Sequence, residues 1–254
     1  LRVEDTDLER SSRVSEAAIL EDIRWMGLDW SEGVEVGGDV GPYRQTERFH
    51  IYRAHTVELL SRGLAYRCFC APEQLEADRQ QALAAGLPPQ YPGRCRDIPA
   101  DVARRRIENG EKAVVRFRVP ADRAVVFPAV VRGEVRFHTS VIGDPVLVRS
   151  DGVPAYNFAV VIDDALMGIT HVVRGEEHLP NTPKQQLLWA ALGSRPPVWA
   201  HVPVLVNEAR KKLSKRRDKV ALESYRDDGY LAAAMVNYLM TLGWAPRAAT
   251  HEAD

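Results

Sequence analysis

The first part of the chain carries apolar residues at helical spacing. They fall three residues apart from Val14 to Ile23, and Gly27 follows as a stop signal, so this segment predicts a helix. Three later segments repeat the pattern and each ends at or before a glycine: 46–62, 71–85 and 101–109. The second of these has a proline in its first turn, as is common at helix starts. All four segments are predicted helices.

The hydrophobic period then shortens to two. From Val115 to Val119 apolar residues alternate with arginines, which is typical of a half-buried strand. Two valine-rich runs flank 132–134 and predict a hairpin. A turn is predicted at 151–152, after the segment 146–149. This part of the chain therefore combines helices with antiparallel strands.

Helical and strand patterns alternate again in the second half of the chain. The apolar segment 156–162 is predicted to be buried and to end at Asp163-Asp164, for which a turn is one interpretation and a structural role the other. A fully buried strand is predicted at 170–174, where two valines precede the final arginine. The triplet Asn181-Thr182-Pro183 combines a helix N-cap with an early proline and predicts the start of another helix.

These patterns divide the chain into four segments. An α/β domain, 1–63 and 154–200, is split by an inserted α+β segment, 64–153, and a mostly helical segment, 201–254, follows. The chain starts at Leu1 without a methionine, and its first residues read as the end of a strand. We therefore expect the natural protein to continue upstream.

Composition narrows the class of protein. With 45% hydrophobic and 27% charged residues and a net charge of -1, the chain has the make-up of an ordinary globular protein and not of a polybasic one. No apolar run approaches the roughly 18 residues that span a bilayer, so no membrane partner is expected. Three cysteines are an odd number, which argues against a disulfide framework and favours a reducing cytoplasm.

A basic run near the end is the most informative segment for function. Five of the seven residues from Lys211 to Arg217 are cationic, and they repel one another unless an anion lies among them. Lysines suit phosphate oxygens, and Ser214 adds a short donor, so the run predicts a polyphosphate site. A solvated surface or a nucleic-acid patch explains the same charges, and the segment by itself does not decide between these interpretations.

Other polar residues stand at the ends of predicted elements. Arg174 closes an otherwise apolar strand, a place where a charge is seldom useful for stability, so we interpret it as functional. The acidic cluster Glu4, Asp5 and Asp7 has a structural alternative, because carboxylates also cap the helix that follows; we prefer that alternative for Asp5 and Asp7. Tyr156 is either a pocket residue or a core aromatic with a satisfied hydroxyl.

Four motifs occur in a fixed order. They are Arg2–Asp7, Pro154–Asp164, Thr170–His178 and Lys212–Arg216. Together they closely resemble the catalytic region of bacterial glutamyl-tRNA synthetases, which are class I aminoacyl-tRNA synthetases, and the resemblance covers essentially the whole chain. It implies a Rossmann-like catalytic domain split by an acceptor-binding insertion, with a mostly helical stem-contact segment after it.

The resemblance also implies an activity. Members of the family ligate L-glutamate to tRNA(Glu) with ATP and Mg²⁺ through a glutamyl-adenylate, and we expect a monomer. Lys212, Ser214 and Lys215 match the catalytic lysine loop. Glu4, Tyr156 and Arg174 match the amino-acid pocket, and Glu177 and His178 match positions near the ATP, which Lys215 also contacts. The family's first phosphate-binding motif is absent from these residues, so we expect an internal fragment that lacks part of the ATP site.

Some members of the family carry a structural zinc in the insertion. By resemblance to them, Cys68, Cys70 and Cys95 are candidate ligands and Tyr91 is the fourth. Other zinc-bearing relatives place a histidine two residues after the last cysteine, where this chain has Asp97. The chain therefore departs from that version of the site.

Three alternatives to this interpretation are open. A paralogue that glutamylates a queuosine base in tRNA(Asp) shares the pocket and the Tyr-x-x-x-Cys ending, but the stretch 236–244 resembles the synthetase itself. A glutaminyl enzyme fits less well, because Arg174 would face a neutral amide. A non-catalytic tRNA-binding fragment fits the absent phosphate motif, but it has no need of the lysine loop.

Overall fold

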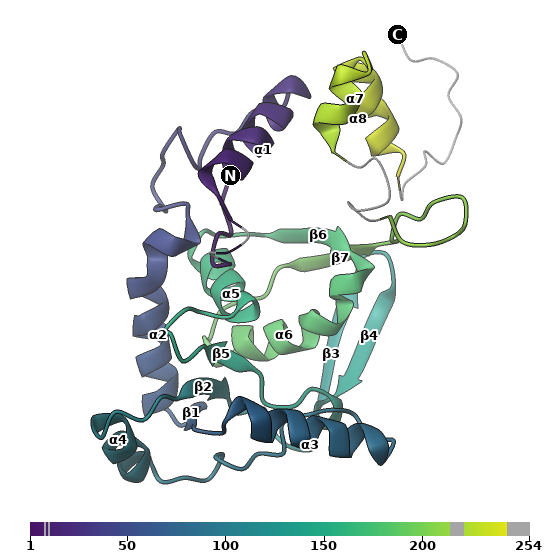
Figure 1. Cartoon of the computed structure of the whole chain (residues 1–254). Helices are drawn as coiled ribbons and strands as arrows, with labels where there is room; N and C mark the ends of the chain where they lie inside the picture. Colours follow the sequence, from purple (N-terminus) through teal and green to yellow (C-terminus); the bar gives the residue numbers. More distant parts are fainter. Residues whose placement is uncertain (8, 10, 214–220, 243–254) are drawn as a thin grey trace.

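The computed structural model describes residues 1–7, 9, 11–213 and 221–242, and Figure 1 shows two β-sheets with helices around them. The helices are α1 (Arg13–Trp25), α2 (Phe49–Ser61), α3 (Pro72–Ala84), α4 (Ala100–Glu108), α5 (Tyr156–Leu166), α6 (Thr182–Ala191), α7 (Leu222–Asp227) and α8 (Ala232–Met240). Short 3-10 helices are η1 (Gln45–Arg48), η2 (Thr139–Val141) and η3 (Glu176–Asn181). The strands are β1 (Ala65–Cys68), β2 (Val114–Phe117), β3 (Ala124–Ala129), β4 (Gly133–His138), β5 (Val146–Val148), β6 (His171–Gly175) and β7 (Val198–Val202).

The helices predicted from apolar spacing are confirmed as α1 to α4, although the first residues of the predicted helix 46–62 belong to η1. The helix α1 begins after Ser12, whose hydroxyl accepts the backbone N–H of Ser15, and it ends before Gly27. The last of the predicted helices is confirmed as α6, with Pro183 in its first turn. Strands β1 and β7 carried no clear sequence pattern and were missed.

A four-stranded sheet positions the candidate pocket. Its strand order is β4-β3-β7-β6, and β6 and β7 run parallel with Arg174 paired to His201. Because the carboxyl ends of parallel strands meet at one edge of a sheet, the side chains that follow both strands gather there. Helices α5 and α6 pack against each other beside this sheet (Figure 1).

The prediction that 170–174 is a fully buried strand is wrong. In the described part of the chain β6 lies at the edge of its sheet and pairs only with β7. Val173 is therefore 69% exposed, although its sequence neighbourhood is apolar. An apolar run does not distinguish an edge strand from a central one.

The second sheet is antiparallel, with the order β1-β2-β5, and lies near α3 and α4 at the end of the molecule opposite α7 and α8 (Figure 1). Strands β3 and β4 form the predicted hairpin around Gly133, but β3 also pairs with β7. The four-stranded sheet therefore includes strands from both sides of residue 153. The four-segment division of the chain stays a prediction.

The main core lies between α2, α5, α6 and the two sheets. Phe158 and Ile162 from α5 and Leu188 from α6 are completely buried within it. The interpretation of Asp163-Asp164 as a turn is wrong, because both residues belong to the last turns of α5. Asp163 is completely buried, so this helix carries a carboxylate into the core.

Candidate active site

A cavity of about 830 Å³ lies between the N-terminal segment, the residues around 30–43, helix α5 and strand β6. Glu4, Tyr156 and Arg174 all line it, although 152 and 18 residues separate them along the chain. Tyr156 is the first residue of α5, and Arg174 lies at the carboxyl end of β6. The structure therefore brings the three residues predicted to bind the amino acid to one cavity.

Arg174 and Tyr156 line this cavity from β6 and α5. The Arg174 guanidinium donates to Thr182 Oγ1 and Gln185 Oε1, at 2.8 Å each, and lies 5.0 Å from the centre of the Trp199 ring. Burial lowers the pKa of Arg174, and burial raises the pKa of Tyr156. Both groups keep their ordinary charge at neutral pH, so the cavity holds a cation beside a neutral phenol.

Glu4 is held in the cavity by Arg2, a residue that the sequence analysis did not select. Arg2 donates to Glu4 Oε1 and to Asp164 Oδ1, at 2.8 Å in each case. Burial lowers the pKa of Arg2, but Asp164 and Glu4 outweigh this effect and raise it above its ordinary value. Arg2 thus links the N-terminal segment to α5. Its signal in the sequence was its position two residues before Glu4, on the same side of an extended segment.

Asp163 anchors the elements that surround the cavity. Its carboxylate accepts hydrogen bonds from Gln45 Nε2 at 2.9 Å, Arg48 Nε at 2.7 Å and Tyr52 Oη at 2.8 Å. Arg48 is itself 1% exposed. Because these partners come from η1 and α2, the cluster fixes α5, and with it Tyr156, against α2.

The residues predicted near the nucleotide lie next to this pocket. The rings of His178 and Tyr156 are 6.0 Å apart, and Lys212 Nζ lies 2.9 Å from Glu177 Oε1. The hydrogen bond from Lys212 lowers the pKa of Glu177. The contact brings one end of the basic run to η3. Ser214 and Lys215 lie outside the described residues.

Asp5 has a different role from the one predicted. It does not cap α1, whose N-cap is Ser12. Its carboxylate accepts the backbone N–H of Thr46 at 2.9 Å and the Thr46 hydroxyl at 2.6 Å, at the start of η1. The carboxylate therefore stabilises a helix start that is distant in sequence, which spacing along the chain does not reveal.

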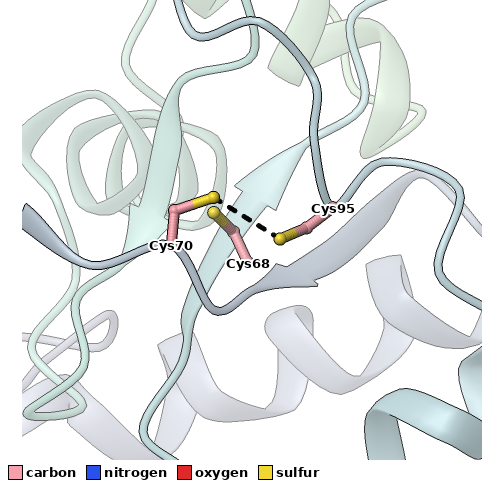
Figure 2. Close-up of side chains that lie close together, drawn as sticks. All are labelled: Cys68, Cys70 and Cys95. Carbon is pink, nitrogen blue, oxygen red and sulfur yellow. Dashed lines mark hydrogen bonds between the residues drawn. The ribbon is translucent and has the colours of Figure 1, made fainter. Parts of the chain in front are cut away.

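The three cysteines gather at the end of β1. Their sulfur atoms lie within 4.8 Å of one another and point toward a common centre, as Figure 2 shows, with 3.6 Å between Cys70 Sγ and Cys95 Sγ. A tetrahedral zinc with Zn–S bonds of about 2.3 Å needs sulfur atoms about 3.8 Å apart. The separation and the soft thiol donors therefore suit a metal ion such as zinc.

A further polar atom lies beside the three cysteines. Tyr91 Oη lies 3.3 Å from Cys68 Sγ and 3.6 Å from Cys70 Sγ. Asp97, by contrast, points away from the cluster: its side chain is 90% exposed and paired with Arg118. Burial raises the pKa of the Cys70 thiol to about 11, so metal binding there must displace a proton.

The buried polar side chains around Arg174 were also missed. Thr182, Gln185 and His201 are each no more than 1% exposed. Thr182 and Gln185 are three residues apart on the buried face of α6, and His201 lies two residues after Trp199 on the buried face of β7. Polar residues at otherwise apolar positions are the signal that marks such sites.

Comparisons with known proteins show the family. The family described as "tRNA synthetases class I (E and Q), catalytic domain" matches residues 1–252. The chain is 52% identical over 246 residues to a glutamate–tRNA ligase of Carboxydothermus hydrogenoformans, covering 97% of this chain and 51% of that protein. It is 54% identical to the corresponding ligase of Heliobacterium modesticaldum, with 97% and 50% covered.

A solved structure has the same fold. A glutamate–tRNA ligase from Elizabethkingia meningosepticum, in complex with its amino acid, superposes with a TM-score of 0.87 at 36% identity and covers 97% of this chain and 54% of that one. The mixed α/β fold is thus that of a class I synthetase catalytic domain. The chain spans about half the length of the curated relatives it matches. Among the described residues, no helix has both the length and the apolar character needed to cross a bilayer.

Proposed function

Because the chain belongs to the catalytic-domain family of class I tRNA synthetases for glutamate and glutamine, we propose that it forms the catalytic part of a glutamate–tRNA ligase. The observation that supports this activity most directly is the cavity that Glu4 and Arg174 both line. A carboxylate and a guanidinium in one cavity suit a ligand with an ammonium group and an additional carboxylate. Glutamate has both groups, whereas the side chain of glutamine is neutral.

The proposed reaction has two steps. The α-carboxylate of glutamate attacks the α-phosphorus of ATP, and the bond to the β-phosphate breaks, which releases pyrophosphate and forms glutamyl-adenylate. A hydroxyl of the terminal ribose of tRNA(Glu) then attacks the acyl carbon, and AMP leaves. In both steps the residues of the chain supply alignment and charge stabilisation and form no covalent bond to the substrate.

Each pocket residue has a role in this proposal. Arg174 binds the side-chain carboxylate of glutamate, and Glu4, oriented by Arg2, binds the ammonium group. Tyr156 closes the pocket between them. Support for the role of Arg174 comes from its half-buried position, where a charged hydrogen bond is shielded from water.

The nucleotide side of the proposal rests on the basic run. Glu177 and His178 contact the nucleotide, and Lys212, Ser214 and Lys215 stabilise the negative charge that develops on the leaving phosphates. ATP is used with Mg²⁺, which supplies charge neutralisation at the phosphates when it is bound. The pairing of Lys212 with Glu177 supports a location of this run beside the pocket.

The segments outside the pocket serve the tRNA in this proposal. The insertion 64–153 contacts the acceptor end, and residues 201–254 contact the stem. Zinc held by Cys68, Cys70, Cys95 and Tyr91 makes the insertion rigid. The short distances between these donor atoms support a zinc site. We place the protein in the cytoplasm, in line with its free cysteines. In this proposal it acts as a monomer.

The test is a thermal-shift measurement of the chain with non-hydrolysable glutamyl-adenylate and glutaminyl-adenylate analogues. At about 100 times its dissociation constant a ligand adds about 2.7 kcal/mol of stability, which is readily measured. We expect stabilisation by the glutamyl analogue and a much smaller effect of the glutaminyl analogue. Equal responses to both, or none, would contradict a glutamate-specific pocket in this chain.

A further inference from the structure

The guanidinium of Arg174 is held on its protein side by three polar side chains. Its Nη2 donates to Thr182 Oγ1 and to Gln185 Oε1, and its Nε lies 3.4 Å from His201 Nε2. Among the described residues, Nη1 has no comparable hydrogen bond, and Tyr156, which interacts with the same guanidinium, lines the cavity. Apart from the interaction with Tyr156, the N–H groups of Nη1 are therefore the ones left for a ligand.

The three supporting side chains are themselves fixed. All are buried, and Gln185 Nε2 donates to Asn157 Oδ1 at 2.9 Å, which orients its amide oxygen toward Arg174. His201 stacks on Trp199 with 6.3 Å between ring centres and 16° between ring planes. Arg174 and His201 are register partners in β6 and β7, so the sheet sets their spacing. Groups held in this way keep their geometry when the ligand is absent.

The hydrogen bonds determine the protonation state of His201. A guanidinium can only donate, so His201 Nε2 must accept, and the imidazole is neutral with its proton on Nδ1. The Thr182 hydroxyl accepts from Arg174 Nη2 and donates to His201 Nε2 at 2.9 Å, so the lone pair of Nε2 is shared between Thr182 and the longer contact with Arg174 Nε. Among the described residues, His201 Nδ1 is buried without a hydrogen-bond partner. Burial, with the charge of Arg174, lowers the pKa of His201 to about 4, in agreement with the neutral form.

We propose that His201, together with Thr182 and Gln185, positions Arg174 for the side-chain carboxylate of glutamate and thereby sets the preference for glutamate over glutamine. This inference rests on the proposed function. His201 does not touch the substrate in this role; it is a positioning residue that acts through Arg174. If the acceptor on His201 is lost, the guanidinium can turn, and its Nη1 no longer faces the carboxylate.

The test is calorimetric titration of the chain with the glutamyl-adenylate and glutaminyl-adenylate analogues, compared between variants. His201→Leu and Thr182→Val remove the acceptor and the bridging hydroxyl with little change in volume. Each should weaken binding of the glutamyl analogue by about 10- to 100-fold, the range for one hydrogen bond to a charged group, and should leave binding of the glutaminyl analogue within about threefold. His201→Gln keeps an acceptor near the position of Nε2 and should retain most of the selectivity.

Thr56→Val is the matched control. Thr56 is also a buried threonine, but its hydroxyl donates to the Tyr52 carbonyl oxygen and it does not line the cavity, so its removal should leave the ratio of the two affinities unchanged. The ratio separates positioning from folding, because a general loss of structure weakens both analogues together. An unchanged ratio in both His201→Leu and Thr182→Val, or an equal loss in His201→Gln, would overturn the positioning role while the proposed function stands. A wild-type chain that does not distinguish the analogues would overturn the proposed function itself.

Discussion

Substitution of Asp163 by asparagine should destabilise the fold strongly. The carboxylate is completely buried and is the ionic partner of Arg48, which is 1% exposed. Asparagine keeps the volume and can keep one oxygen toward Arg48, so no cavity arises and the loss is mainly that of the negative charge. The guanidinium is then left with neutral acceptors: the amide oxygen of the asparagine and the carbonyl oxygens of Val40 and Pro42, at 3.2 and 2.9 Å.

The size of the effect follows from this burial. Removing one partner of a buried ion pair typically costs 3–5 kcal/mol, because the other charge stays buried without compensation. The amide group of asparagine must in addition face Gln45 and Tyr52, which both donate to the carboxylate in the native protein. We therefore expect a loss of about 3–5 kcal/mol, a large part of the 5–15 kcal/mol by which domains are stable.

The measurement is urea denaturation followed by circular dichroism, with the free energy of unfolding extrapolated to water. The midpoint should fall while the dependence on urea stays the same, because the exposed surface of the unfolded chain does not change. Glu134→Gln is the matched control: it makes the same chemical change in an ion pair with Arg136 whose side chains are 65% and 66% exposed, and should cost less than about 1 kcal/mol. A loss below about 1 kcal/mol for Asp163→Asn would refute the argument from burial.

Four further predictions concern the pocket, the basic run, the metal site and pH. Arg174→Ala should weaken binding of the glutamyl-adenylate analogue by about 2–5 kcal/mol in calorimetric titrations, and an unchanged affinity would remove this residue from the pocket. Lys215→Ala should slow adenylate formation in single-turnover assays more than it weakens glutamate binding; a change confined to the Michaelis constant for glutamate would contradict its role. Tyr91→Phe should lower the affinity for zinc in competition with a chelator, whereas Asp97→Ala should not, because the Asp97 side chain is 90% exposed and paired with Arg118. Burial, with the charge of Arg174, lowers the pKa of His201 from 6.5 to about 4, so the unfolded chain binds a proton in this range that the folded chain does not. Stability should therefore fall as the pH falls from 6.5 to 4, by at most about 3 kcal/mol from this group, and His201→Gln should show a smaller fall in urea denaturation.

The helices were predictable because their signals are local. Spaced apolar residues, a hydroxyl before α1, a proline at the start of α3 and glycines after helix ends all lie within a few residues of the element they define. Strands β1 and β7 were missed for the opposite reason. They are short, and they are stabilised by pairing with strands distant in sequence, β2 and β6 respectively.

The same distinction applies to the candidate site. Arg174 was identified because a charge at the end of an apolar strand is conspicuous in one segment. The roles of Arg2 and His201 were not, because each depends on a partner brought close by folding: Asp164 for Arg2 and Arg174 for His201. The burial of Asp163 was missed as well, since adjacent aspartates in a sequence more often indicate a turn than a core.

By itself the sequence determined the positions of α1 to α4 and α6, the order of the four motifs and the types of residue available for chemistry, because these depend on neighbours along the chain. Only the tertiary structure decided which charges are buried, which residue orients which, and that the sulfur atoms of Cys68, Cys70 and Cys95 meet (Figure 2). The physical reason is that the free energy of a charge or a metal ligand depends on its solvent exposure and its partners. Both are set by contacts between residues far apart in the sequence.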